Sequence, residues 1–358
     1  MTEMTKRKLI LILILVLSLV GFKNSYAAGL SKTVEVAIVQ VEKVQYKLNG
    51  VWTDVPAGGF TDICKDSGIT FKAILSPTGA PPSAGCPKWG GDASGDGEEK
   101  QVTFSSSGAR SVTVECGNTI TIPVAVGVAN IPVTINWTTA GYTSINSTGA
   151  STTVERTFTT TYTACADIDN NVWRLRVESV TGGVDITVRT GGSRDPFANP
   201  PISQIEAVDA VTVMKDYYTR GSRGSWHTEA ASKSHEEYHY SEWKCSSDHY
   251  WSATETALEN LTVPYDTSNK AVAIAALRSG TTGADAKMIN FKTIARQYWF
   301  TLSDGPSSRP YAAGQLTLNA AIIFVQNLAV TNGWTVPPGT NNPSTANPCY
   351  ETWLPYSP

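Results

Sequence analysis

The stretch GARSVTVECGN, residues 108–118, alternates apolar and polar side chains and ends at a glycine and an asparagine. A period of two places Val112 and Val114 on one face, as in a strand with one buried side. The same alternation occurs at Val34–Ile38 and Thr70–Leu75, with turn-forming residues between the runs. Short alternating strands at this spacing are typical of a β-sandwich, which we expect from about residue 34 to residue 126.

The chain has 358 residues and six cysteines. In an exported protein, six cysteines most simply form three disulfides. Cys64 lies just before the strand expected to start at Ile69, and Cys116 lies just after the strand expected to end at Val114. We therefore predict a bridge between Cys64 and Cys116, because these strands should be neighbours.

A second β-rich segment is expected at residues 128–200. The stretch from Thr138 to Thr163 is rich in Thr and Ser, so a flexible linker is one interpretation. Strands are the preferred one, because Thr has high β propensity and apolar residues recur through the stretch. Gly182-Gly183 has the composition of a hairpin turn between two of these strands. The expected strands are Ile131–Trp137, Thr152–Tyr162, Trp173–Val177 and Val184–Val188.

After Pro200-Pro201 the apolar spacing becomes helical. Gly333 is well placed to end the last helix. The proline-containing tail, residues 335–358, is expected to wrap the surface and to be tied down through Cys349. The expected helices are Thr228–Ser246, His249–Leu261, Ala284–Leu302 and Ala312–Asn332.

The N-terminus has the layout of a secretory signal peptide. Basic residues at 6–8 precede an aliphatic run, Leu9–Val20, and Ser25-Tyr26-Ala27 has the small residues of a cleavage site. The aliphatic run is shorter than the roughly 20 residues of a spanning helix, so cleavage is favoured over a membrane anchor. We expect a secreted or cell-surface protein, with the periplasm as a further possible location.

The formal net charge of −3 gives no indication of a nucleic-acid partner. No segment beyond the signal is apolar enough to predict a membrane span. We therefore expect neither a nucleic-acid-binding nor a membrane-spanning protein.

The motif His235-Glu236-Glu237-Tyr238-His239 is the strongest chemical signal in the chain. On a helix, residues four apart lie on one face, so His235 and His239 can reach the same ion. Neutral imidazoles suit zinc, and Glu236 stands at the position of the general base. The alternative is that these residues form a charged, solvent-exposed helix face that binds no metal. With four histidines in the whole chain, this spacing favours a metal site.

The third ligand is less clearly indicated. Glu255 is the first choice, provided that a turn near Ser246-Ser247-Asp248 starts a new helix. An unbroken helix would carry Glu255 roughly 24 Å from His239 along the axis. The other candidates are Glu259, Glu242 and His227. Candidate donors to a developing oxyanion are the phenols of Tyr298, Tyr311, Tyr217 and Tyr218, although packing is the commoner role for such residues.

Two regions resemble known families. Trp89-Gly90-Gly91-Asp92, a Phe104 strand and the final Val-x-Val strand resemble a bacterial PKD/Ig-like domain over about 60 residues. Such modules serve as spacer or adhesive units. The region 226–261, with Trp226-His227-Thr228 before the His-Glu helix, resembles secreted bacterial zinc metallopeptidases of the HExxH (zincin) type. That resemblance implies that His235 and His239 are zinc ligands and that Glu236 is the base.

The expected fold class is multi-domain, β followed by α+β. The expected parts are a signal peptide at 1–27, an Ig/PKD-like β-sandwich at 28–127, a β-rich segment at 128–200, a mainly helical zincin-like domain at 201–334, and the tail at 335–358. The leading hypothesis is a secreted peptidase that hydrolyses proteins or peptides through a zinc-bound water. The alternative is a non-enzymatic cell-surface or matrix protein, with adhesion through the β-sandwich and a structural or vestigial metal site.

Overall fold

A computed structural model describes residues 38–77, 85–127, 132–146, 153–265, 269–300, 304–345, 347–349 and 352–358. The expected signal peptide, 1–27, lies outside these residues. Residues 39–358 form one compact unit. The boundaries that we expect within this unit, at residues 127 and 200, remain predictions.

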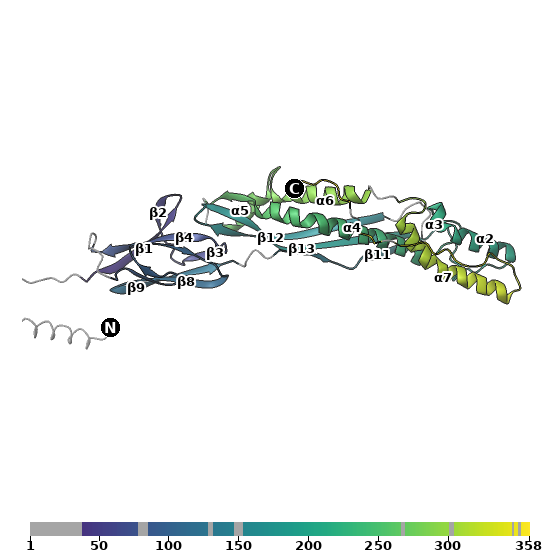
Figure 1. Cartoon of the computed structure of the whole chain (residues 1–358), viewed down its shortest axis with the longest axis horizontal. Helices are drawn as coiled ribbons and strands as arrows, with labels where there is room; N and C mark the ends of the chain where they lie inside the picture. The colour runs from purple at the N-terminus through teal and green to yellow at the C-terminus, as the bar shows by residue number, and fades with distance from the viewer. Residues whose placement is uncertain are drawn as a thin grey trace, which may run out of the picture. The chain divides into compact units, whose positions relative to one another are not determined.

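The chain is β-rich in its N-terminal two-thirds and helical toward its C-terminus, as expected (Figure 1). The first strands are β1 (Gln40–Leu48), β2 (Val51–Asp54), β3 (Phe60–Ile63), β4 (Gly68–Ser76), β5 (Lys88–Gly91), β6 (Gly95–Asp96), β7 (Glu99–Thr103), β8 (Gly108–Cys116) and β9 (Asn118–Val126). The later strands are β10 (Ile135–Trp137), β11 (Gly141–Ile145), β12 (Thr153–Asp167), β13 (Val172–Arg189) and β14 (Thr262–Pro264). The helices are α2 (Gln204–Lys215), α3 (Tyr217–Arg220), α4 (Glu229–Glu259), α5 (Lys270–Arg278), α6 (Ala284–Phe300) and α7 (Arg309–Thr331).

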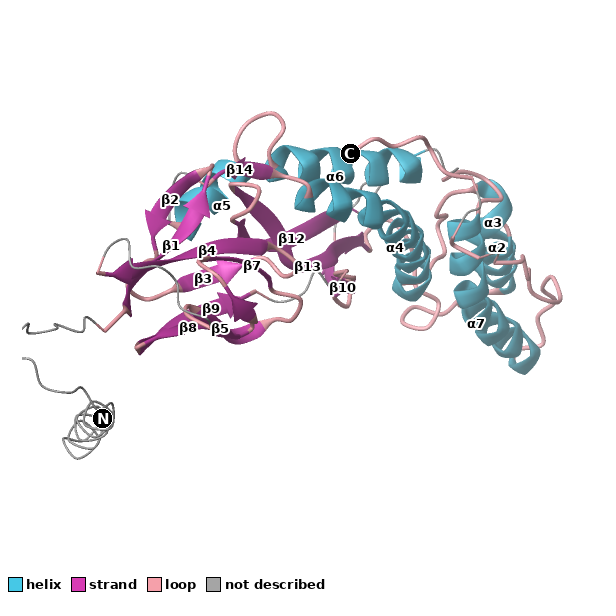
Figure 2. Ribbon diagram, turned by 60° about the vertical axis from the view of Figure 1, so that its left-hand side comes forward, coloured by secondary structure: helices cyan, strands magenta, loops and turns pink. Residues whose placement is uncertain are grey.

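Two sheets organise the strands (Figure 2). An antiparallel sheet has the order β2-β1-β4-β7, and a mixed sheet runs β10-β13-β12-β3-β9-β8-β5-β6, with β11 and β14 also paired to β13. Aromatic side chains fill the space between the sheets near the N-terminus. Phe71 of β4 lies 6.0 Å from Phe60 and 6.3 Å from Trp89, between ring centroids. Burial of these large rings contributes to the stability of this core.

The predicted disulfide Cys64–Cys116 is wrong. Cys64 is bonded to Cys165, Cys86 to Cys116, and Cys245 to Cys349. Strand pairing explains the first two bridges: Ala166 of β12 pairs with Ile63, and Lys88 of β5 pairs with Glu115 of β8. Each pairing brings together the two cysteines that lie next to the paired residues or within two positions of them. The spacing of cysteines along the sequence does not show which strands are paired.

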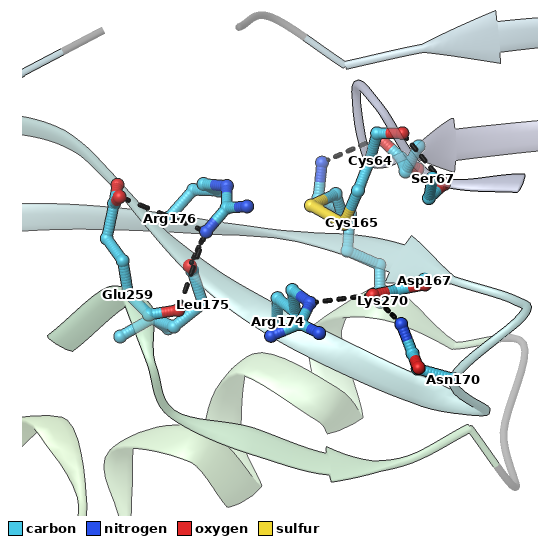
Figure 3. The surroundings of a disulfide bond; sticks show 11 residues. Cys64, Ser67, Cys165, Asp167, Asn170, Arg174, Leu175, Arg176, Glu259 and Lys270 are labelled. Carbon is cyan, nitrogen blue, oxygen red and sulfur yellow. Dashed lines mark hydrogen bonds and ion pairs between the residues drawn. A yellow bond between two sulfur atoms is a disulfide. The ribbon is translucent and has the colours of Figure 1, made fainter. Parts of the chain in front are cut away.

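The Cys64–Cys165 bridge lies where β3 meets β12, beside a polar network (Figure 3). The backbone N–H of Cys64 donates to the carbonyl of Ala166 at 2.9 Å. Asp167 is 5% exposed and accepts hydrogen bonds from Arg174 and Asn170, each at 2.8 Å. A buried carboxylate requires such partners, so the network stabilises this junction of the mixed sheet.

The hairpin predicted at Gly182-Gly183 is also wrong, because β13 continues through both residues. A Cβ atom at Gly182 would lie 2.5 Å from the indole of Trp137, and one at Gly183 would lie 2.6 Å from Oγ1 of Thr138. These glycines therefore permit close approach by the segment containing β10, rather than a turn. The Thr-rich stretch does form strands, β11 and β12, in its described residues.

Helices α4, α5 and α6 lie over the long strands β12 and β13 (Figure 1). Phe158 of β12 contacts Trp243 of α4 and Phe291 of α6, each with ring centroids 5.0 Å apart. Helix α7 packs against α4 and α2. It ends before Gly333, as predicted, and the φ of 66° at Gly333 is the left-handed conformation that commonly follows the end of a helix. By length and composition α7 could also cross a membrane, but 44% of its most apolar window is buried inside the protein.

The predicted break near Ser246-Ser247-Asp248 is wrong, because α4 is one helix of 31 residues. Ser246 and Ser247 are fully buried, and Oγ of Ser246 donates to the carbonyl of Ala295 in α6 at 3.1 Å. Ser246 therefore contacts α6 from the middle of α4, and neither serine caps a new helix. Helices α2, α3 and α5 were not predicted.

The tail follows the surface of the helices, as expected. Cys349 is bonded to Cys245 of α4. Farther along, Trp353 stacks on His249 with ring centroids 3.9 Å apart, and the carbonyl of Leu354 accepts a hydrogen bond from Tyr250.

Candidate metal site

The first turns of α4 place both motif histidines on its buried side. Thr228 caps the helix, because its hydroxyl accepts a hydrogen bond from the N–H of Ala231 at 3.2 Å. His235 and His239 are 7% and 4% exposed. Their rings lie 4.9 Å apart between centroids, one helical turn from each other. The two imidazoles can therefore reach a common point.

Asp304 completes the group. Its Oδ1 lies 3.3 Å from Nε2 of His235 and 3.5 Å from Nε2 of His239. Candidate ligand atoms of these three residues all lie within 4.8 Å of one another. In the part of the chain that the structure describes, this is the cluster of three such side chains that could hold a metal ion. Sequence reasoning missed Asp304.

The loop bearing Asp304 is fixed against α3. The N–H of Ser307 donates to the carbonyl of Tyr218 at 2.8 Å. Pro306 packs on Gly221, where an added Cβ would lie 2.4 Å from the proline nitrogen. Gly221 has a φ of 64° and ends α3. A side chain at this position would displace the loop and, with it, Asp304.

Both imidazoles are held from behind through Nδ1. Nδ1 of His239 lies 2.9 Å from Oε2 of Glu242, which is 1% exposed. Nδ1 of His235 lies 3.4 Å from the hydroxyl of Tyr217 on α3. When Nδ1–H donates to these oxygens, the lone pair of each ring is on Nε2, toward Asp304. Metal-binding histidines characteristically have such an outer partner.

The two separations between Asp304 and the imidazole nitrogens suit the ligands of a tetrahedral ion. Bonds of about 2.0–2.1 Å separate the ligands of tetrahedral zinc by roughly 3.3–3.4 Å. The distances of 3.3 Å and 3.5 Å from Asp304 to the imidazoles match this separation. They are longer than the about 2.7–2.9 Å of a good charged hydrogen bond. The group thus supplies two nitrogens and one oxygen, a donor set that zinc accepts.

Charges at the site are strongly coupled. Burial disfavours protonation of His239, but hydrogen bonds with Asp304 and Glu242 outweigh it and raise its pKa to about 9. Burial would raise the pKa of Asp304, whereas hydrogen bonds with both histidines hold it below its ordinary value. An ion at Nε2 would compete with the proton there, so we expect metal affinity to fall at low pH.

Two phenols adjoin the histidines. Tyr311, in the first turn of α7, has its ring centroid 4.6 Å from that of His235 and 5.0 Å from that of Tyr217. Burial, with the charges of Asp304 and Glu236, raises the pKa of Tyr311 to about 12. Burial also raises the pKa of Tyr217. Both hydroxyls therefore keep their protons at neutral pH and can donate.

The other residues that the sequence suggested as a third ligand do not join the ligand group. The choice of Glu255 is wrong because α4 is unbroken, which places it about 24 Å along the axis from His239. Its carboxylate instead accepts from the N–H of Val133 at 2.5 Å. Glu259 lies another turn farther along, 3.9 Å from Arg176. Glu242 stands behind His239, and His227 bonds Ser232 at 2.8 Å.

The remaining tyrosines do not join the ligand group. The N–H of Tyr218 donates to the side chain of Gln315 at 3.1 Å. The side chain of Tyr298 lies outside the described set. Glu236 is half-buried beside the cluster, and its charge contributes to the raised pKa of both Tyr217 and Tyr311.

A search of protein-family models gives no match to this chain, and no curated protein matches it.

Proposed function

We propose that this protein is a secreted zinc-dependent metallopeptidase that acts on proteins or peptides. The supporting observation is the convergence of His235, His239 and Asp304, at distances of 3.3 Å and 3.5 Å that suit the ligands of one tetrahedral ion. Three protein ligands with one open position are the pattern of catalytic rather than structural zinc. Zinc bound there would act as a Lewis acid toward a peptide carbonyl.

The protein groups have separate roles in this proposal. Glu236 follows the first ligand and accepts a proton from the attacking water as general base. Tyr311, which stays protonated and packs on His235, is the candidate donor to the oxygen that gains charge as the carbonyl is attacked, whereas Tyr217 orients His235 through Nδ1. Asp304 partly offsets the charge of the cation, and Glu242 orients His239.

The N-terminal strands support an auxiliary role. We propose that β1–β9 form an Ig/PKD-like module that acts as a spacer or attaches the catalytic part to a cell surface or matrix. Trp89 of β5 is 2% exposed, and its Nε1 donates to the carbonyl of Gly97 at 2.7 Å. The three disulfides favour an oxidising, extracellular location.

The decisive experiment substitutes Glu236 by Gln and compares this variant with Glu237→Gln. Both changes remove one carboxylate from adjacent positions of α4. Glu237 is exposed and accepts a hydrogen bond from Tyr142 at 2.6 Å. We expect E236Q to keep its zinc and to lose about 10²–10⁴-fold in hydrolysis of an unfolded protein. E237Q should keep both properties.

Equal activity of E236Q and wild type would place the hydrolysis elsewhere. A wild-type protein that binds zinc but cleaves none of a broad peptide library would favour the adhesive alternative. Purified protein that neither contains nor takes up zinc would reject the site itself.

A further inference from the structure

Gln315 is a fully buried polar side chain of α7. It shares the buried face of the helix with Leu318, Ile322 and Val325, whose exposed fractions are, like its own, 0%. Residues three and four apart lie on one face of a helix, and a face that packs into a core is ordinarily apolar. Burying an amide is unfavourable unless its polar atoms are hydrogen-bonded. The partners of Gln315 therefore show what this amide does.

The amide of Gln315 holds the junction between α2 and α3. Its Nε2 donates to the carbonyl of Met214, in the last turn of α2, at 3.0 Å, and to Oδ1 of Asn319 at 3.3 Å. Its Oε1 accepts from the N–H of Tyr218, in α3, at 3.1 Å. The last carbonyls and the first N–H groups of a helix lack regular partners within the helix. One side chain of α7 thus bonds the end of α2 and the start of α3.

Helix α3 contacts both sides of the metal site. The hydroxyl of Tyr217 lies 3.4 Å from Nδ1 of His235, and the carbonyl of Tyr218 accepts from the N–H of Ser307 at 2.8 Å, in the loop that bears Asp304. With four residues, α3 is too short to be stable by itself. Its position, and with it the spacing of the two ligands, depends on its contacts with the rest of the fold.

The residue before Gln315 is also fitted to α3. A Cβ atom at Gly314 would lie 2.7 Å from Cε1 of Tyr217, 3.0 Å from its hydroxyl and 3.0 Å from the carbonyl of Ala231 in α4. Glycine weakens a helix relative to alanine, but here it makes room for the ring that reaches His235. Two consecutive residues of α7 therefore fix α3, one through its backbone and the other through its tyrosine ring.

We propose that Gln315 is a positioning residue of the metal site, acting through α3 on both His235 and Asp304. The inference rests on the metal site of the proposed function. None of the hydrogen bonds of Gln315 reaches a ligand, so its effect is indirect. Without the amide, α3 would lose a bond at its start and its tie to α2. Nε2 of His235 and Oδ1 of Asp304 would then lose their separation of 3.3 Å.

The test replaces Gln315 by Met, an unbranched side chain of similar length that lacks the amide. Gln326→Met is the matched control, because Gln326 lies on the same helix and donates to the carbonyls of Pro337 and Gly339, at 2.9 Å and 2.8 Å, rather than to α3. Zinc affinity is measured on the disulfide-bonded full chain by competition with a chromophoric chelator. Circular dichroism checks that each variant is folded under the same conditions.

We expect Q315M to lose about 10–100-fold in zinc affinity, the range for outer partners of metal ligands. Q326M should bind zinc as the wild type does. The visible absorption of the cobalt-substituted proteins is a second readout, because it reports the arrangement of the ligands around the metal. Q315M should change this spectrum, whereas Q326M should leave it as in the wild type.

Tyr217→Phe gives a result even if Q315M does not fold. It removes only the hydroxyl through which α3 meets His235, so zinc affinity should fall about tenfold. Unchanged affinity in Y217F or in folded Q315M would overturn the positioning role while leaving the metal site in place. An equal loss in Q315M and Q326M would also overturn it, because a general loss of stability would then explain both. A wild-type protein that binds no zinc would reject the site itself.

Discussion

Oε2 of Glu242 lies 2.9 Å from Nδ1 of His239, one turn farther along α4, and this carboxylate is 1% exposed. A carboxylate is rarely buried to this extent without a compensating partner. The contact leaves Nε2 of His239 directed toward Asp304, 3.5 Å away. Glu242 thus orients the imidazole that we propose as a ligand, whereas Asp304 would itself bind the ion.

Glu242→Gln tests this division of roles. The amide keeps the shape of the side chain but removes its charge, so the imidazole becomes a weaker ligand. We expect zinc affinity to fall about 10–100-fold, as for other outer partners of metal-binding histidines. The measurement is competition with a chromophoric chelator. Unchanged affinity would mean that the buried pair serves only packing.

Asp304→Ala should reduce zinc affinity more than Glu242→Gln, because it removes a ligand atom itself. Glu255→Ala is the control, since Glu255 was the sequence-based choice and has an acidic side chain on the same helix as the histidines. We expect E255A to bind zinc normally. Metal content by mass spectrometry, measured on chelator-free protein, decides between the two carboxylates.

Glu255→Ala should instead lower the free energy of unfolding. Its carboxylate accepts from the N–H of Val133, and Nε1 of Trp251 donates to the carbonyl of the same residue, each at 2.5 Å. Losing one partner of a partly buried backbone group costs about 1–3 kcal/mol. Denaturant unfolding would measure this loss. No loss would indicate that water replaces the carboxylate.

Residues close in the sequence were predictable, and contacts between distant segments were not. The motif spacing and helical periodicity placed His235 and His239 together on α4. Asp304 comes from a loop 65 residues beyond His239, and it reaches the histidines because its loop packs on α3. No local pattern distinguishes Asp304 from other acidic loop residues.

The helix break wrongly predicted at Ser246 and Ser247 shows the same limit of prediction from local sequence. Ser246 and Ser247 are common at helix starts, so they suggested a cap. Both are fully buried within α4, and Ser246 contacts α6, which begins almost 40 residues farther along the chain. Similarly, Gly182-Gly183 suggested a turn, although it accommodates the indole of Trp137. In each case tertiary packing overrides the local preference.

His227 should make stability depend on pH. Burial, followed by the charges of Arg223 and His235, lowers its pKa to about 3. The unfolded chain, with a histidine pKa of about 6.5, therefore binds a proton that the folded protein excludes between these two values. The contribution of His227 to stability is full above pH 6.5 and is lost as the pH falls toward 3.

The expected loss from this residue between pH 7 and pH 5 is about 2 kcal/mol. Unfolding of wild type and His227→Gln by urea at both pH values isolates the effect, because other titrating groups are common to both proteins. A difference that does not change with pH would show that folding leaves the pKa of His227 unchanged.

The Cys245–Cys349 bridge gives the last prediction. It joins α4 to the tail across 104 residues, whereas Cys86–Cys116 spans 30 residues. Closing a longer loop restricts the unfolded chain more, by about 4.7 kcal/mol for the first bridge and about 3.6 kcal/mol for the second. Replacing both cysteines by serine should therefore destabilise the protein more for the Cys245–Cys349 pair. Denaturant unfolding of the two double variants, with peptide mapping of the remaining bridges, measures the difference. The reverse order would mean that noncovalent contacts, such as Trp353 on His249, hold the tail after the bridge is removed.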